Sequence, residues 1–116
     1  MNSQHSFEKG ADIRSLQEAI DFIAEKFVFD EASYPLLQKL SPEEKLQFSV
    51  NHSLQHMAKV LGKIATHLED VDHGGAGSAD LLHEGLVKQL INVLRLAELL
   101  DISGDDLLKD IPKFVR

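Results

Sequence analysis

The sequence predicts an all-α domain, an antiparallel helical bundle with two long central helices. Three observations support this fold class. Apolar residues recur every three or four positions along most of the chain, capping residues precede the periodic segments, and no useful stretch alternates as a strand does. The 116 residues are 43% hydrophobic and 27% charged, which is typical of one globular domain. We expect residues 1–11 to form a loose N-terminal arm and residues 12–116 to form the single domain.

The first helix is predicted to begin at Asp12, whose side chain can cap it, and to end near Asp30. Its apolar positions fall on one stripe at about 100° per residue. They are Ile13, Leu16, Ile20, Ile23, Ala24 and Phe27. A connector follows, because Pro35 disfavours helix at Tyr34.

The second helix has the strongest start signal. Residues 41–44, Ser-Pro-Glu-Glu, combine a cap, a proline at the first helical position and a glutamate three residues after the cap. The helix is expected to reach Leu68 or Val71, where three glycines within residues 74–77 end it. Its apolar stripe contains Leu54, Met57, Ala58, Leu61, Ile64, Ala65 and Leu68.

The third helix is predicted to start after Ser78 or Asp80 and to run to about Asp101, before a short last helix over residues 107–111. Its apolar residues cover more surface than one partner helix can bury. They are Leu81, Leu82, Leu86, Val87, Leu90, Ile91, Val93, Leu94, Leu96, Ala97, Leu99 and Leu100. A second contact is therefore implied, with another helix or with another subunit, and we expect a homodimer with Leu96 and Leu99 in its interface.

The composition excludes several classes of protein. The absence of Cys rules out disulfide scaffolds, zinc ribbons and thiol catalysis. A net charge of −7 argues against a nucleic-acid polymer as partner. No run is long and apolar enough for a membrane helix, and the first residues do not form a secretory signal. The expectation is a cytoplasmic protein that does not enter membranes.

Polar residues that could bind a ligand or take part in catalysis lie on one face of the second helix. They are His52, His56, Lys59, Lys63, His67 and Asp70. The i, i+4 spacing of His52 and His56 can place two imidazoles on one transition metal, although a solvated face, a subunit contact or an anion site would use the same pattern. On the third helix Glu84, Lys88 and Arg95 share a face with Asn92 nearby, and Glu84 and Lys88 are spaced as a favourable ion pair.

Acidic residues surround the glycine loop, and His73 lies among them. They are Glu69, Asp70, Asp72, Asp80 and Glu84. Carboxylates of this kind can hold a hard divalent cation, or they can cap helices and keep the loop hydrated. The regular alternation of a calcium loop is missing, so Glu69, Asp72 and Glu84 are only weak candidates for metal ligands.

Two segments carry a resemblance to a known family. Residues 92–103, Asn-Val-Leu-Arg-Leu-Ala-Glu-Leu-Leu-Asp-Ile-Ser, and residues 106–108, Asp-Leu-Leu, resemble a helix end and the short helix that follows it in the MazG-like all-α nucleoside triphosphate pyrophosphohydrolases. Residues 59–65, Lys-Val-Leu-Gly-Lys-Ile-Ala, resemble an earlier helix of the same family. The resemblance covers about half of the chain and implies a dimeric or tetrameric helical bundle that handles nucleotides.

The sequence departs from that family at the metal ligands. The resemblance implies Mg²⁺ held by an ExxE and an ExxD, but the corresponding positions are Val60 and Lys63, and Gly85 and Lys88. The implied protein has a degenerate magnesium site and is either inactive or a nucleotide or anion binder, with Mg²⁺ as a cofactor only if the family activity is retained. No catalytic residue is assigned. The candidate cleft and anion-binding residues are His56, Lys63, His67, Glu84, Lys88 and Asn92. The alternative is a helical homo-oligomeric interaction module without nucleotide chemistry.

Overall fold

The computed structural model describes residues 12–115, and this part of the chain is helical without any strand. The elements are α1 (Leu16–Lys26), η1 (Pro35–Lys39), α2 (Pro42–Asp72), α3 (Ala79–Leu99) and α4 (Gly104–Phe114), where η1 is a 3₁₀ helix. The predicted all-α class is confirmed. The predicted arm over residues 1–11 lies outside the described residues. No helix within residues 12–115 is long and apolar enough to cross a lipid bilayer.

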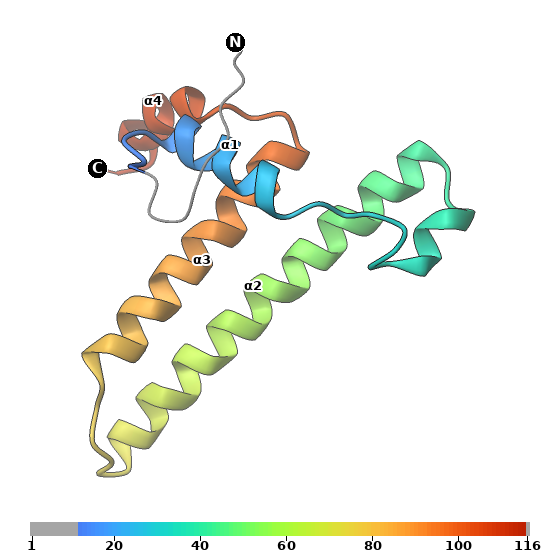
Figure 1. Cartoon of the computed structure of the whole chain (residues 1–116). Coiled ribbons are helices and arrows are strands. Elements are labelled where there is room, and N and C mark those ends of the chain that lie inside the picture. Colours follow the sequence, from blue (N-terminus) through green and yellow to red (C-terminus); the bar gives the residue numbers. More distant parts are fainter. Residues whose placement is uncertain (1–11, 116) are drawn as a thin grey trace.

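Helices α2 and α3 form a long antiparallel hairpin, with α1 and α4 gathered at its open end (Figure 1). The two long helices approach closely at Gly85. A Cβ atom at this position would lie 2.8 Å from Cγ1 of Ile64, so the glycine allows α3 to pack directly against α2. The predicted pair of long helices is therefore present and is joined by the glycine loop.

Serine caps set the starts of both long helices. Ser41 and Glu44 form the predicted capping box, in which the Ser41 Oγ accepts from the Glu44 amide and the Glu44 carboxylate accepts from the Ser41 amide. Ser78, rather than Asp80, caps α3. At the tip of the hairpin Gly74 has a φ of 91°, a conformation that favours glycine.

Helix α1 is shorter than predicted at both ends. Its N-cap is Ser15, whose hydroxyl accepts from the Glu18 amide, while Asp12 instead pairs with Arg14. The helix ends at Lys26 because Phe27 has an extended backbone, and the chain then runs to η1 as the connector 27–34. This early end lets the aromatic residues of the connector turn toward α2 and α3.

Helix α4 is longer than the predicted 107–111 segment. Ser103 caps it through the Asp106 amide, so the helix begins at Gly104. Pro112 lies inside the last turn. A proline lacks only its own N–H, and the loss of one bond in a terminal turn does not stop the following residues from remaining helical.

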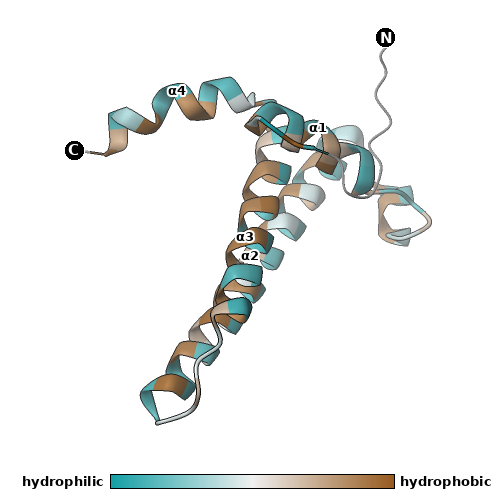
Figure 2. Cartoon of the chain, turned by 60° about the vertical axis from the view of Figure 1, so that its left-hand side comes forward, coloured by the Kyte–Doolittle hydropathy of each residue, from teal (hydrophilic) through white to brown (hydrophobic). Residues whose placement is uncertain are grey.

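The core of the described chain is small. Ile20 and Ile23 of α1 pack against Leu94 and Ala97 of α3, and few other large side chains are fully buried. Apolar residues along the hairpin remain uncovered, and Figure 2 shows hydrophobic positions following one another along α3. Leu86 is 67% exposed and Leu61 is 60% exposed. Leu96 and Leu99 are partly buried in the single chain, whereas Leu86 and Leu90 are more exposed.

The contact between α1 and α4 should be intolerant of any side chain at Gly104. A Cβ atom there would overlap the backbone nitrogen of Gln17 and lie 2.7 Å from the Leu16 carbonyl carbon. The Gly104 amide also donates to the Gln17 side chain at 2.8 Å. Gly104→Ala is expected to lower the free energy of unfolding by about 1–3 kcal/mol, because backbone must move apart.

Urea unfolding measures this change, and Gly62→Ala is the matched control. Nothing lies within 4 Å of a Cβ atom at Gly62, which is in the middle of α2, so alanine there should stabilise the protein by about 0.5–1 kcal/mol. Equal effects of the two substitutions would contradict the proposed close packing of α4 on α1.

Candidate anion-binding groove

Two neighbouring pockets form a groove along one side of the hairpin. The first has a volume of about 540 Å³ and lies between α3, α2 and the connector 27–34. The second has a volume of about 290 Å³ and lies between α2 and α3, nearer the tip. His56, Val60 and Lys88 line both pockets, so the two are continuous in the residues that form them.

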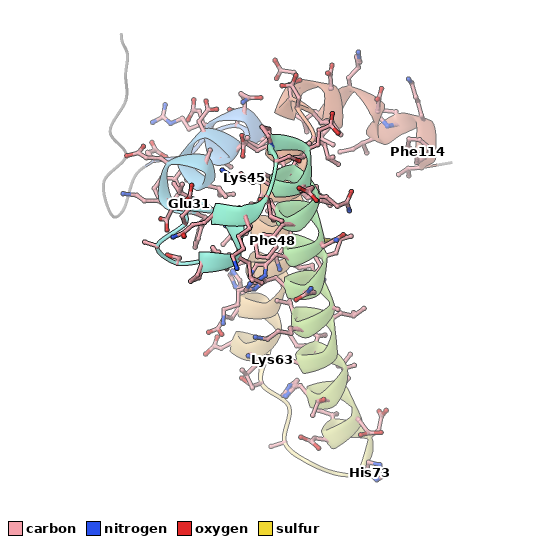
Figure 3. The ribbon with its side chains drawn as sticks, turned by 90° about the vertical axis from the view of Figure 1, so that its right-hand side faces the viewer. Glu31, Lys45, Phe48, Lys63, His73 and Phe114 are labelled. Atoms are coloured by element: carbon pink, nitrogen blue, oxygen red, sulfur yellow. The ribbon has the colours of Figure 1, made fainter. Side chains whose placement is uncertain are left out.

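Several cationic side chains line this groove. Five of the chain's 12 Lys and Arg residues line it, although the chain as a whole has a net charge of −7. They are Lys26 from α1, Lys59 and Lys63 from α2, and Lys88 and Arg95 from α3. Figure 3 shows Lys63 on α2, between the aromatic end of the groove at Phe48 and the hairpin tip at His73. Clustered positive charges of this kind favour the approach of an anion, even on an acidic protein.

Arg95 is the most enclosed of these cations. Its guanidinium lies 3.9 Å from the centroid of the Phe29 ring and 5.3 Å from that of Phe27, which places it over two aromatic faces. Burial lowers the pKa of Arg95, with Tyr34 and Glu98 acting in the opposite direction. Among residues 12–115 no carboxylate lies within salt-bridge distance of it, and its Nε is buried without a hydrogen-bond partner.

An aromatic cluster fixes the open end of the groove. Phe29 and Tyr34 from the connector meet Phe48 and His52 from α2, and the His52 ring stacks on Phe48 at 11°. The Tyr34 hydroxyl lies 3.3 Å from Nε2 of His52, and Nε2 of His56 lies 3.1 Å from the same atom. Burial lowers the pKa of His52, and the nearby His56, Arg95 and Lys59 lower it further.

Glu84 is the one acid in the groove, and it lines the second pocket. Its carboxylate lies 2.8 Å from the Lys88 ammonium, as the i, i+4 spacing predicts. The hydrogen bond and charge of Lys88 lower the pKa of Glu84, and Lys63 contributes to the same effect. The Glu84 carboxylate is therefore ion-paired with Lys88 in the groove.

The residues at the expected metal positions do not fit a magnesium ion. All four positions, Val60, Lys63, Gly85 and Lys88, line the second pocket. None carries an oxygen ligand and two carry ammonium groups, whereas Mg²⁺ requires carboxylates or other oxygen donors. Within residues 12–115 no three His, Asp or Glu side chains form a group that could hold a metal ion. Glu69, Asp72 and Glu84 are thus not brought together as ligands within this chain.

The structure brings five of the six predicted cleft residues into the groove. His56 and Lys88 line both pockets, Lys63 and Glu84 line the second, and Asn92 lines the first. The sixth, His67, lies near the tip, where its Nε2 accepts from the Ser78 amide at 3.1 Å. His67 therefore joins the end of α2 to the start of α3 and lines neither pocket.

Sequence reasoning did not assign several residues of the groove. They are Lys26, Tyr34, Lys59 and Arg95. Lys26 directly precedes the connector and Tyr34 is its last residue, and their position follows from the early end of α1, which the apolar stripe did not reveal. Arg95 carried a usable signal, since it interrupts an otherwise apolar stretch of α3 and shares a face with Lys88.

Comparisons of the chain with protein-family models, with curated proteins and with solved structures gave no match. Function is therefore inferred from the residues of the groove.

Proposed function

We propose that this protein is a metal-free member of the MazG-like fold that binds a nucleotide or a related organic phosphate without hydrolysing it. The observation that carries the proposal is the groove itself, in which five Lys and Arg side chains face one acid on a chain of net charge −7. Clustered ammonium and guanidinium groups are the groups with which proteins hold phosphates. A cytoplasmic location is part of the same proposal.

The two pockets suit different parts of such a ligand. The first has apolar and aromatic walls, including Phe27, Val28 and Ile91, with Arg95 and Asn92 as polar groups. A flat organic body would pack there. The second has Lys59, Lys63 and Lys88 around a narrow space, which suits a phosphate chain. Lys88 lines both pockets and would contact the ligand where these parts join.

Fixed ammonium groups would replace the metal ion in this proposal. A magnesium ion neutralises phosphate charge and activates a water, whereas lysines at the same positions supply only the neutralising charge. Among the residues lining the groove the only carboxylate is Glu84, which is held by Lys88. Binding without hydrolysis follows from this set of side chains.

Calorimetric titration with nucleoside triphosphates and with pyrophosphate, in EDTA and in Mg²⁺, tests the proposal. We expect tighter binding in EDTA, since Mg²⁺ neutralises the ligand, and no release of pyrophosphate in either condition. Glu84→Gln should tighten binding about three- to tenfold, because it removes the opposing charge and frees Lys88. Glu69→Gln, at the far end of α2 and outside both pockets, is the matched control.

A hydrolase with a rearranged metal site would behave in the opposite way. Mg²⁺ would then be required, pyrophosphate would be released, and Glu84→Gln would abolish the release. The absence of binding in both conditions would also exclude the proposed function.

A homo-oligomeric interaction module is the second candidate, favoured by the uncovered apolar side of the hairpin. At about 100° per residue from the contact between Ile64 and Gly85, the groove residues lie toward one side of the hairpin and most of the exposed apolar residues lie toward the other. The exposed residues are Leu54, Leu61 and Leu68 on α2 and Leu86, Val87, Leu90 and Val93 on α3. We name them the apolar face and propose that a second copy of the chain covers it in a dimer or tetramer. Anion binding and association use opposite sides, so both functions can coexist.

A further inference from the structure

His56 occupies an unusual position in the groove, between the aromatic cluster and the lysines. Its ring lines both pockets, and its Nε2 lies 3.1 Å from Nε2 of His52. Two unprotonated nitrogens cannot hydrogen bond to each other, so one of these nitrogens carries the hydrogen. The Tyr34 hydroxyl lies 3.3 Å from the same His52 nitrogen and completes the arrangement.

The surroundings of His52 disfavour its protonated form. Its ring stacks on Phe48 and meets Phe29 and Tyr34 edge-on, so the site is largely apolar. Burial and the neighbouring cations lower its pKa, which favours the neutral ring. A neutral His52 has one lone pair at Nε2, which accepts either from the Tyr34 hydroxyl or from the Nε2–H of His56. In the arrangement that we assign, His56 is the donor, and Nδ1 of His56 remains available to a proton.

Proton uptake by His56 needs no rearrangement under this assignment. The imidazolium keeps its Nε2–H bond to His52 and gains a second N–H at Nδ1. The charged groups facing it come from every neighbouring element. They are Lys26 on α1, Lys59 and Lys63 on α2, and Glu84, Lys88 and Arg95 on α3, with the Tyr34 hydroxyl on the connector. The lysines and Arg95 oppose another positive charge in the empty groove, and a bound anion would offset their effect.

We propose that His56 couples anion binding to proton binding, so that the groove takes up one proton with its anion and holds that anion more tightly as the pH falls through the histidine range. The inference rests on the proposed anion binding of this groove. Because linkage is reciprocal, the same coupling appears as a pH-dependent affinity and as proton uptake on binding. His52 acts as a positioning residue, since its acceptor nitrogen sets which nitrogen of His56 is free.

The test uses 1,5-naphthalenedisulfonate, a flat dianion whose charge is constant between pH 5.5 and 8, so any pH dependence belongs to the protein. We expect the full-length chain to bind it about tenfold more tightly at pH 5.5 than at pH 8.0, from one added charge in the groove. Calorimetry in two buffers of different ionisation heat should show proton uptake on binding near pH 7. His56→Gln should bind with little pH dependence and without proton uptake.

Two further variants keep the result interpretable. His83→Gln, which removes an imidazole from the other side of α3, should retain the full pH dependence. His52→Phe keeps the stacked ring but removes the acceptor, and it should reduce the proton uptake while circular dichroism confirms the helices. Binding that is equally tight at both pH values would overturn the coupling and leave the proposed function intact. The absence of binding at either pH would overturn both.

Discussion

Reversing two charges in the groove, Lys63→Glu together with Lys88→Glu, is expected to weaken phosphate binding by at least about a hundredfold. Both ammonium groups line the second pocket, and Lys88 lines the first as well. Each reversal replaces an attraction of about 1–2 kcal/mol by a repulsion at partly exposed sites, and the two add because they act on the same anion. Titration with pyrophosphate in EDTA, at low and at high salt, measures the loss.

The matched control reverses two charges elsewhere, with Lys109→Glu and Lys113→Glu on α4. It changes the net charge by the same amount, and both lysines pair with aspartates of their own helix, away from the groove. Binding by this control should stay within about twofold of the original chain, since more distant charges are screened. A similar loss in both variants would mean that net charge, rather than the groove, attracts the anion.

Placing charges on the apolar face, Leu86→Glu together with Leu90→Glu, is expected to separate the proposed dimer into monomers. These side chains are 67% and 50% exposed in the single chain. A two-fold symmetric interface contains each residue twice, so the two substitutions remove four leucines from it. Each lost leucine reduces the free energy of association by about 1.5 kcal/mol or more. The dissociation constant should rise on the order of 10⁴-fold. Sedimentation of both proteins across a range of concentrations checks this result.

Leu36→Glu together with Phe114→Glu provides the comparison. Both residues are strongly exposed, at 68% and 85%, but they lie on η1 and α4, outside the apolar face. This variant should remain associated. An unchanged dimer in Leu86→Glu with Leu90→Glu, and helices that remain intact by circular dichroism, would exclude the apolar face as the interface.

Local signals allowed the long helices to be predicted well. The sequence Ser-Pro-Glu-Glu at 41–44 specifies its own hydrogen bonds, so the start of α2 depended on nothing distant. The ends of α1 were mispredicted because apolar periodicity continues to Phe27, whereas the backbone leaves the helix there. What decides this end is the packing of the connector's rings on Arg95 and Phe48, which are far away in sequence.

The groove could be predicted only as far as it follows helical spacing. His56 and Lys63 share a face of α2, and Glu84, Lys88 and Asn92 share a face of α3, so their gathering follows once the helices pair. The contribution of Lys26 and Tyr34 depends on how the connector crosses the hairpin. No periodicity encodes that crossing, and the aromatic cluster that holds it involves residues up to 23 positions apart, Phe29 to His52.

The aromatic cluster also gives the protein a built-in optical reporter. The chain contains one tyrosine and no tryptophan, so its near-ultraviolet emission beyond that of phenylalanine arises from Tyr34 alone. That ring lines the first pocket, and its hydroxyl lies 3.3 Å from His52. A ligand or a proton that enters the groove changes the surroundings of this single fluorophore directly. Occupancy can therefore be followed in the unmodified chain, without a label and without a substitution in the groove.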